Sequence, residues 1–421
     1  MVVGVTVWRY TQRVRLDRYD SYLRTFHASV TEQRHDGRGT WLRLDRSAFY
    51  PQAGGQPHDV GSLLLEGKRL EVVEVQADAD DEVWHLLSAP SPTAGAPELI
   101  GAALVGEIDW PCRWRHMQRH SAQHMLSAAL VRVDPAFGTL AVSMRGPDCT
   151  IEVAGEMTPQ QLMEVEREVN RAARENYPIT AFEVAESRLS EYALRRPAKA
   201  SGLVRLVAMG QYDLVACGGT HLRSTAETLP IKVLGVERVR GSNSRLTFRA
   251  GEEASEDYSV KHTVVTRLGQ LLSAPATGLP ERAERLNEEV AVANREADAW
   301  RSLLATKLAA ELAEARSAPH APLVAVLEGQ EAALLTDLME ACQRLDGVVA
   351  LLAAAAPGQT QLAFVAGPGT NVDVRPLLSA AIAELGGRGG GRHDRAQGAA
   401  QASAEQVRAV LAGVAASLAG D

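Results

Sequence analysis

The chain has 421 residues, which is long enough for two to four domains. Its formal net charge is −8, so it lacks the strongly basic net charge typical of proteins that coat nucleic acids. The four cysteines, Cys112, Cys149, Cys217 and Cys342, are far apart, which excludes a short-chain disulfide framework and indicates a reducing compartment. No run of residues has the apolar length of a membrane span, and the N-terminus lacks the apolar core of a signal peptide, so we expect a cytoplasmic protein without a membrane partner.

Residues 1–105 alternate apolar and polar side chains in short bursts that turn residues separate. Typical bursts are "TWLRLD" (40–45) and "RLEVVEVQ" (69–76). Because successive side chains of a strand point to opposite faces, this alternation predicts an antiparallel sheet, which we expect to close into an N-terminal β-barrel. The stretch 91–103, "SPTAGAPELIGAA", is predicted to be a loop.

Residues 106–250 mix helical and strand-like patterns, which predicts an α+β domain. The segment "RHMQRHSAQHMLSAALVRV" (115–133) has apolar residues at helical spacing and is predicted to be an amphipathic helix. A second helix is expected between Thr158, a good N-cap residue, and Pro178. Strand-like segments follow at 179–184, 203–209, 230–239 and 244–251.

The C-terminal part is predicted to hold a helical segment and a separate small domain. Residues 251–318 are rich in Ala, Glu, Arg and Leu, and an apolar stripe that includes Trp300, Leu304 and Leu308 indicates a helical hairpin or coiled coil. Residues 319–421 alternate strand-like and helical stretches, typical of a small α/β domain. Arginines are concentrated in 1–50 and 201–250, and such local basic surfaces attract polyanions even to an acidic protein.

Two pairs of residues with zinc-ligand chemistry lie in the predicted α+β domain. Cys217 and His221 are four positions apart in "CGGTH", and His120 and His124 are four positions apart on the predicted helix, so that each pair can share one metal ion. His116 pairs with His120 at the same spacing, and spacing alone does not choose between the two histidine pairs. A thermolysin-like protease is excluded because Ser121, not glutamate, follows His120.

Four motifs in this order resemble those of the alanyl-tRNA synthetase editing and C-terminal domains and of the free-standing AlaX trans-editing proteins in their long form. They are "SAFYPQAGGQPHDVGSL" (47–63), "GEIDWPCRWRHMQRHSAQHM" (106–125), "CGGTHL" (217–222) and "GGRGGGRHDRAQGA" (386–399). The aminoacylation domain of the synthetase has no counterpart in the sequence. The resemblance covers nearly the whole chain and implies four parts: a β-barrel with a glycine-rich motif (1–105), a zinc-binding editing domain (106–250), a helical segment (251–318) and a C-terminal α/β domain (319–421).

The resemblance implies an aminoacyl-tRNA deacylase that acts on tRNA(Ala) charged chiefly with serine, with glycine as the second candidate. The resemblance also implies that the Zn²⁺ ligands of the family correspond to His120, His124, Cys217 and His221 in this chain, and that His116 is not a ligand. The sequence departs from the family in having Met144 near the position of an editing-pocket glutamine, and Ser47 where threonine is usual.

The catalytic residues remain open, because no general base is evident in the sequence. Ser47 is a candidate to hydrogen-bond the hydroxyl of the substrate serine, and the alternative is a turn serine that caps the backbone. Gly54, Gly55 and Gln56 are candidates for a wall of the editing pocket, or else for an ordinary hairpin turn. His85 is expected to be a satisfied histidine of the sheet.

The C-terminal half is expected to recognise tRNA and to associate. Arg388, Arg392 and Arg395 of the glycine-rich stretch are candidates for tRNA contacts, although the stretch could also be a disordered linker. The apolar stripe of the helical segment must be covered either by the first helix of the same segment or by a second chain, and we expect a homodimer. The rival function for the whole chain is a tRNA-binding or assembly module with a purely structural zinc.

Overall fold

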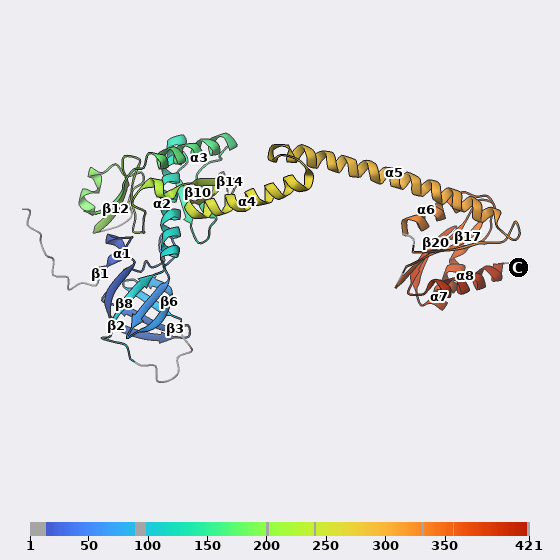
Figure 1. The fold of residues 1–421 in the computed structure, drawn as a ribbon, viewed down its shortest axis with the longest axis horizontal. Coiled ribbons are helices and arrows are strands. Elements are labelled where there is room, and N and C mark those ends of the chain that lie inside the picture. The colour runs from blue at the N-terminus through green and yellow to red at the C-terminus, as the bar shows by residue number, and fades with distance from the viewer. Residues whose placement is uncertain are drawn as a thin grey trace, which may run out of the picture. The chain divides into compact units, whose positions relative to one another are not determined.

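The computed structural model describes residues 14–88, 98–198, 202–239, 241–329, 332–356 and 358–418. The chain divides into two compact units, Met1–Thr266 and Arg267–Asp421 (Figure 1). Residues 91–97 of the predicted loop and residues 1–13 of the arginine-rich N-terminal stretch lie outside the described residues. The finer division into four parts stays a prediction.

The predicted N-terminal barrel is confirmed. Six strands close it in the order β2-β3-β7-β6-β5-β8, and a short parallel pair, β1-β4, lies beside them with helix α1. Large apolar side chains such as Phe26, Leu42, Phe49 and Leu63 are buried and form its core. The elements are β1 (Val14–Arg15), α1 (Leu16–Tyr19), β2 (Thr25–Asp36), β3 (Gly39–Leu44), β4 (Arg46–Ser47), β5 (Gly61–Leu65), β6 (Lys68–Ala77), β7 (Val83–Leu87) and β8 (Ala103–Ile108).

The rest of the N-terminal unit is α+β, as predicted. Helices α2 and α3 pack on a four-stranded antiparallel sheet, β14-β15-β10-β9, and a three-stranded sheet, β11-β12-β13, carries the "CGGTH" loop after its last strand. Thr158 caps α3 in a capping box with Gln161. The elements are α2 (Trp110–Val133), β9 (Thr139–Ser143), β10 (Cys149–Val153), α3 (Pro159–Arg174), β11 (Ile179–Ala185), η1 (Glu186–Glu191), β12 (Leu203–Met209), β13 (Asp213–Ala216), η2 (Thr225–Thr228), β14 (Ile231–Arg238) and β15 (Ser244–Ala250).

Helix α2 differs from the amphipathic helix that its apolar spacing predicts. From His116 to Leu130 every residue is buried, polar ones included. The polar residues of the helix find partners on several sides: Arg119 donates to Glu253 Oε2 at 2.7 Å, and Gln118 donates to the Glu227 carbonyl at 3.0 Å. A helix surrounded by other elements has no solvent-facing side, so its polar residues form buried hydrogen bonds instead.

A fully buried ion pair joins α2 to the barrel. Arg113 Nε lies 2.9 Å from Asp59 Oδ1, and neither side chain has any exposed surface. The same guanidinium donates to the Ser21 and Ala48 carbonyl oxygens, while Asp59 also accepts from Tyr50 N at 2.6 Å. The pair therefore fixes the glycine-rich motif of the barrel against the start of α2.

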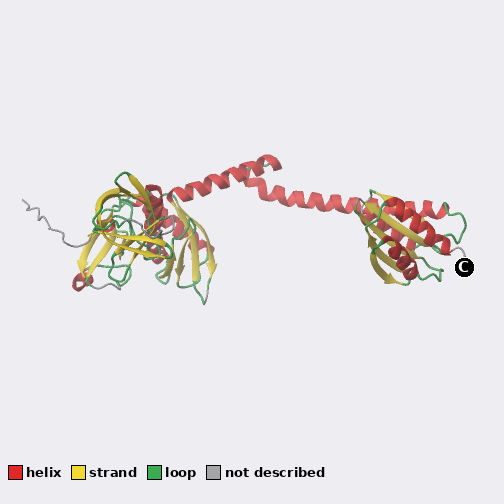
Figure 2. Ribbon diagram, turned by 90° about the horizontal axis from the view of Figure 1, so that it is seen from below, coloured by secondary structure: helices red, strands yellow, loops and turns green. Residues whose placement is uncertain are grey.

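The C-terminal unit is a sheet between two layers of helices (Figure 2). Its strand order is β16-β17-β18-β20-β19; α6 and the last turns of α5 pack on one face, and α7 and α8 pack on the other. Together with α4 and η3, the elements are α4 (Gly251–Leu272), η3 (Ala276–Gly278), α5 (Leu279–Glu314), β16 (Leu323–Glu328), α6 (Ala332–Gln343), β17 (Val349–Ala356), β18 (Gln359–Ala366), α7 (Val374–Leu385), β19 (Arg388–Arg392), β20 (Arg395–Ala400) and α8 (Ala404–Leu418).

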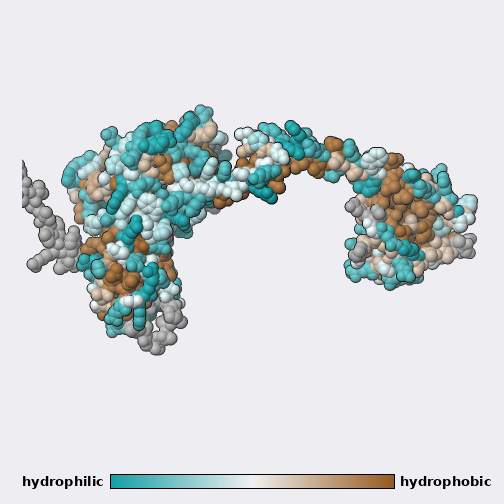
Figure 3. Space-filling model, in the orientation of Figure 1, coloured by the Kyte–Doolittle hydropathy of each residue, from teal (hydrophilic) through white to brown (hydrophobic). Residues whose placement is uncertain are grey.

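The segment 251–318 is helical, as predicted, but much of its apolar stripe is exposed. Trp300 and Leu304 of α5 are 70% and 47% exposed, whereas Ala305 and Ala309 in the next turns are buried on the C-terminal core. Brown apolar side chains lie among teal polar ones along the long helices in Figure 3. None of the described helices is both long and apolar enough to cross a membrane.

Candidate metal centre

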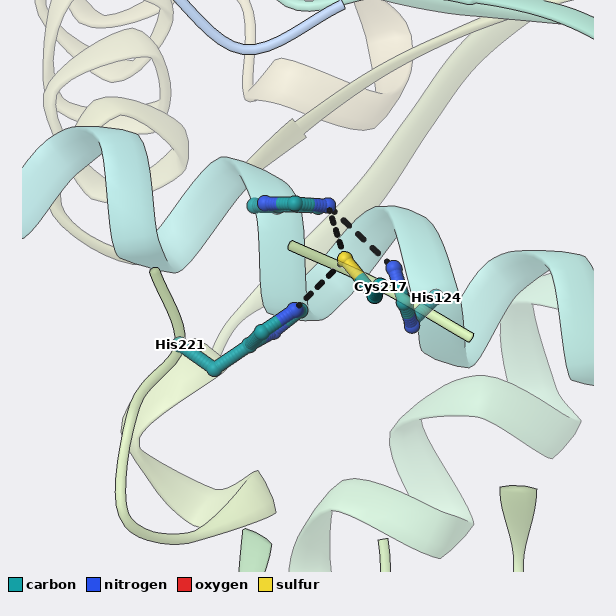
Figure 4. Close-up of side chains that lie close together, drawn as sticks. His124, Cys217 and His221 are labelled. Carbon is teal, nitrogen blue, oxygen red and sulfur yellow. Dashed lines mark hydrogen bonds between the residues drawn. The ribbon is translucent and has the colours of Figure 1, made fainter. Parts of the chain in front are cut away.

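The structure brings the four predicted ligands together. The ligand atoms of His120, His124, Cys217 and His221 all lie within 4.8 Å of one another, and they form the one such histidine, cysteine and carboxylate group found among the described residues. In Figure 4, the side chain of Cys217, which comes from the "CGGTH" loop, lies between those of His124 and His221. His116 takes no part: its Nε2 faces Cys112 Sγ at 3.7 Å, so the choice that spacing left open falls to His120 and His124.

Three of the separations between the ligand atoms fit a tetrahedral zinc site. Zinc–nitrogen bonds of about 2.05 Å and a zinc–sulfur bond of about 2.3 Å, at tetrahedral angles, place two nitrogens about 3.3 Å apart and nitrogen about 3.6 Å from sulfur. The Nε2 atoms of His120 and His124 are 3.2 Å apart. Cys217 Sγ is 3.4 Å from the Nε2 atoms of both His120 and His221. The donor set and spacing therefore suit one Zn²⁺ ion.

Local sequence explains how the loop reaches the helix. His120 and His124 lie one turn apart on α2, so both rings face the same side. A Cβ at Gly219 would lie 2.0 Å from His120 Cε1, and only glycine permits this close approach. Arg205 of β12 braces the loop by donating from Nη1 to the carbonyl oxygens of Cys217 and Gly219, at 2.8 and 3.0 Å.

Each histidine has an oxygen atom near its outer ring nitrogen. His120 Nδ1 lies 2.6 Å from Gln56 Oε1, and Gln56 also donates to Thr220 Oγ1 at 2.8 Å. His221 Nδ1 lies 3.2 Å from Ser121 Oγ, and His124 Nδ1 is 3.9 Å from the Asp213 carboxylate. The amide carbonyl oxygen of Gln56 accepts the Nδ1–H of His120, which leaves the Nε2 lone pair of that ring free for a metal ion, as a metal-ligating histidine requires. His124 Nδ1 has no hydrogen-bond partner among the described residues.

Burial favours the protonation states that bind metal at the histidines. It lowers the pKa of His120 to about 3 and holds the pKa values of His124 and His221 well below their usual range, so the imidazoles are neutral at pH 7. Burial also raises the pKa of the Cys217 thiol, so this side chain becomes a thiolate ligand only when a metal ion displaces its proton.

A cavity of about 450 Å³ opens beside these four side chains. Gly54 and Gly55 line one wall, with φ of 57° and 85°, and Val142 of β9 lies so close that a Cβ at Gly55 would be 3.0 Å from it. Gln56 is fully buried behind this wall and contacts His120. Another wall holds a hydrogen-bonded chain in which Gln123 and Thr139 both donate to Ser127, each at 2.8 Å.

Ser47 and His85 form a buried pair inside the barrel. His85 Nδ1 lies 3.0 Å from the Leu42 carbonyl, which can only accept, so Nε2 is the unprotonated nitrogen and Ser47 donates to it at 2.8 Å. Ser47 also accepts from Phe49 N at 3.1 Å. His85 is thus satisfied at both nitrogens, as predicted, while Ser47 is not among the described residues that line the cavity of the metal centre.

The predicted arginines of the C-terminal unit lie on a hairpin. Arg388 is the first and Arg392 the last residue of the edge strand β19, and both are exposed. Arg395 is the first residue of β20, and its Nη1 lies 3.8 Å from Glu340 Oε1. The glycine-rich stretch is therefore an ordered β-hairpin, which excludes the linker alternative. Sequence reasoning missed Ser121, Asp213 and Arg205; Ser121 directly follows a ligand, but the other two carry no motif.

Comparisons with known proteins agree with the motifs. The family model "Threonyl and Alanyl tRNA synthetase second additional domain" matches residues 204–247. The alanyl-tRNA editing protein AlaX-L of Pyrococcus horikoshii is 28% identical over 404 residues, which cover 92% of this chain and 95% of that protein. The alanine–tRNA ligase of Pyrococcus abyssi is 31% identical over 391 residues, or 90% of this chain and 41% of the ligase.

The chain thus spans about two fifths of the length of that ligase. Among solved structures, the C-Ala domain of Aquifex aeolicus alanyl-tRNA synthetase matches 22% of this chain and 88% of that domain, with 22% identity and a TM-score of 0.20. This score is too low to support an inference about the fold.

Proposed function

We propose a function from one premise: the chain is a homologue of the AlaX-type alanyl-tRNA editing proteins in their long form, and is similar to the editing and C-terminal regions of alanine–tRNA ligases. On this premise it is a trans-editing hydrolase. It cleaves the ester between a wrong amino acid and tRNA(Ala), chiefly serine, with glycine as a second substrate, and requires no ATP for this hydrolysis.

One observation carries the proposal: His120, His124 and Cys217 of the three-histidine, one-cysteine group line a cavity of about 450 Å³ together with the glycine-rich motif. A cavity of this size suits a small ligand such as an amino acid on its terminal nucleoside. The motif reaches the site from the barrel and the histidines from α2, so the Arg113–Asp59 pair that joins these elements also fixes the shape of the cavity.

Different residues of the cavity would bind the metal ion and recognise the side chain of the substrate. Zn²⁺ held by His120, His124, Cys217 and His221 would supply positive charge that orients the substrate or stabilises developing negative charge. The hydroxyl of a substrate serine would meet the Gln123–Ser127–Thr139 chain on the cavity wall, and alanine would leave these polar groups unpaired.

No free carboxylate base is available at the described cavity wall. The one carboxylate there, Asp81, is ion-paired with Arg15 and Arg18, each at 2.8 Å. Because the substrate is already an activated ester, positioning of the substrate and of a water molecule, together with electrostatic stabilisation, would account for its hydrolysis.

The second candidate function is a tRNA-binding module with a structural zinc. It is favoured by the separations of the four ligand atoms, since a closed tetrahedral site leaves no open position for water. This candidate predicts binding of tRNA(Ala) without release of the amino acid.

Release of amino acid from charged tRNA(Ala) tests both candidates. The full chain should deacylate Ser-tRNA(Ala) fastest, Gly-tRNA(Ala) more slowly and Ala-tRNA(Ala) hardly at all, and removal of zinc by a chelator should abolish the reaction. Binding of all three tRNAs with no release of serine would instead support the structural-zinc module.

The C-terminal unit would recognise tRNA and associate with a second copy. Arg388 and Arg392 are exposed on the β19–β20 hairpin, where they can reach phosphate groups, and Arg395 is half-buried beside them. The exposed stripe with Trp300 and Leu304 would be covered in a homodimer.

A further inference from the structure

A second cavity adjoins the one at the metal centre. It also has a volume of about 450 Å³, and both cavities are lined by Arg18, Arg196 and residues 216–218. The "CGGTH" loop therefore contributes to both, and a chain-like ligand could pass from one cavity to the next beside Gly218. The four motifs of the sequence assign nothing to this second space.

Three arginines face the second cavity against a single carboxylate, that of Glu183. Arg18 is ion-paired with Asp81 at 2.8 Å, yet its buried Nε has no partner. Arg196 is exposed and has no hydrogen bond or ion pair to any described residue. The wall is thus positively charged, with donors that the surrounding residues leave free.

Arg205 is the unusual member of the three. All its hydrogen bonds go to carbonyl oxygens: Nε donates to Arg18 at 3.1 Å, and Nη1 donates to Cys217 and Gly219. No described carboxylate lies within ion-pair distance, and Nη2 donates to no described residue. Its charge is half-buried without a counter-ion among the described residues, so an anion that reached Nη2 would relieve the cost of burying this charge.

The rest of the second cavity is apolar. Its other lining residues include six apolar ones from β12, from β13 and from the segment before β12: Pro197, Ala198, Leu203, Val204, Val215 and Ala216. An apolar wall next to guanidinium groups suits a ligand that combines a phosphate with a ribose or base. A free carboxylate or inorganic phosphate would leave this apolar wall unused.

We propose that the second cavity binds the nucleotide that precedes the aminoacylated one, with its phosphodiester held by Arg196 and Arg205 and its sugar or base on the apolar wall. The terminal nucleoside with its amino acid then occupies the cavity of the metal centre. This subsite rests on the proposed function, and it would read the 3′ end of tRNA through its backbone, not through the identity of the amino acid.

Arg196→Ala is the test variant because Arg196, unlike Arg205, braces no part of the metal-ligand loop. Arg174→Ala is the matched control: Arg174 is an exposed arginine at the end of α3 that lines neither cavity. The substrates are a seryl-minihelix that ends in the single-stranded 3′ nucleotides of tRNA(Ala), and seryl-adenosine, which contains no phosphate.

Arg196→Ala should lower kcat/KM for the seryl-minihelix about tenfold more than for seryl-adenosine, as loss of one charge-assisted phosphate contact predicts. The slope of log(kcat/KM) against log salt should become shallower by about 0.7 for the minihelix alone. Arg174→Ala should change neither value. An equal loss on both substrates, or no loss on either, would overturn the subsite.

Binding of uncharged minihelices separates failure of the subsite from failure of the proposed function. Wild-type protein should bind a complete minihelix more tightly than one that lacks its last two nucleotides. Arg196→Ala should lower this ratio of affinities about tenfold, because it loses one phosphate contact and keeps the contacts of the terminal nucleoside, and Arg174→Ala should leave the ratio unchanged. If wild-type protein hydrolyses no substrate, the proposed hydrolase function fails, but this coupling still decides whether the subsite exists. If wild-type protein hydrolyses the seryl-minihelix and the coupling is absent, only the subsite is wrong.

Discussion

The two units of the chain differ most in what they bury. Among the described residues, the C-terminal unit buries a single polar side chain, Thr360, whereas the N-terminal unit buries many, including Arg113, Asp59, His120 and Gln56. Every buried side-chain nitrogen or oxygen without a hydrogen-bond partner in the described part also lies in the N-terminal unit. The C-terminal unit instead exposes its polar groups, as on the β19–β20 hairpin.

This difference indicates where chemistry and recognition take place. A buried polar group is costly unless it is hydrogen-bonded, so a fold that buries many of them around one point uses them to hold a site. An apolar core with a polar exterior gives stability and a surface for contacts. We therefore expect substitutions of buried polar groups to affect metal binding and activity in one unit and stability alone in the other.

The largest effect should come from a pair of cysteines, one in each unit. Cys217→Ala removes a metal ligand, and we expect zinc to be lost and deacylation of Ser-tRNA(Ala) to fall by more than about 100-fold. Cys342→Ala should keep both, because Cys342 is buried in the apolar C-terminal core with its thiol pKa raised to about 11.

Zinc content measured by mass spectrometry, together with the deacylation rate, checks this pair. Full zinc occupancy and activity in Cys217→Ala would remove the metal centre as the basis of function. Loss of zinc in Cys342→Ala would break the contrast between the units.

The next effect concerns stability. Asp59→Asn leaves the Arg113 guanidinium buried without its counter-charge, and we expect the free energy of unfolding of the N-terminal unit to fall by about 3–5 kcal/mol. Thr360→Val removes a hydrogen bond of 2.8 Å to the Ala402 carbonyl in the C-terminal unit and should cost only about 1 kcal/mol. Urea titrations that follow each unit separately would test this order, which equal costs would contradict.

A pH-dependent effect should appear in the barrel. Burial lowers the pKa of His85 to about 4, below the unfolded value of about 6.5, so the folded state holds this ring neutral. The unfolded chain binds the proton first as the pH falls, and His85 therefore contributes stability that is present above pH 6.5 and lost between about pH 6.5 and 4. Relative to His85→Gln, wild-type protein should lose about 2.5 kcal/mol of stability from pH 7 to pH 4.5.

Urea denaturation of both proteins at several pH values measures this difference. Subtracting the curve of the variant removes the contributions of other titrating groups, the metal centre included. A constant difference across the range would show that His85 does not titrate in this way.

The same contrast explains what the sequence could predict. Barrel strands and helices follow from periods of two and 3.6 residues, so they were predicted well. Spacing placed His120 and His124 on one helix face but could not exclude His116, because the deciding partners, Gln56 and the "CGGTH" loop, arrive from other parts of the chain. Arg205 and Asp213 are single residues in ordinary strands, and only the three-dimensional arrangement places them at the site.

A smaller effect is expected when the C-terminal unit is removed. A cut after Gly251, at the end of the predicted editing domain, would lose Glu253, which pairs with the buried Arg119, so a cut after Thr266 is the better test. We expect the truncated chain to keep its deacylation rate at saturating tRNA. Its KM for tRNA should rise about tenfold, with a shallower salt dependence, if phosphate contacts of Arg388 and Arg392 are lost.

Sedimentation of the full chain at micromolar concentration tests the association proposed for the exposed stripe. A dimer that becomes monomeric on Trp300→Glu would support it, and a monomeric wild-type protein would exclude it. Unchanged KM and salt slope in the truncated chain would show that the C-terminal unit does not bind tRNA.

The smallest effect should distinguish two serines of the N-terminal unit. Ser127 lines the cavity and accepts hydrogen bonds from Gln123 and Thr139, whereas the hydroxyl of Ser47 donates to His85 and accepts from Phe49 N, beside Tyr50 of the cavity wall. If Ser47 sets selectivity, Ser47→Ala should reduce the preference for serine over glycine by about 1–2 kcal/mol, through the position of Tyr50. Ser127→Ala should reduce it by a similar amount, because the direct contact with the substrate hydroxyl is lost.

The ratio of kcat/KM values for Ser- and Gly-tRNA(Ala) measures both effects. Urea titration reports the stability that Ser47→Ala loses when His85 Nε2 is left without its donor. An unchanged ratio with lowered stability would restrict Ser47 to capping the backbone and leave selectivity to the cavity wall at Ser127.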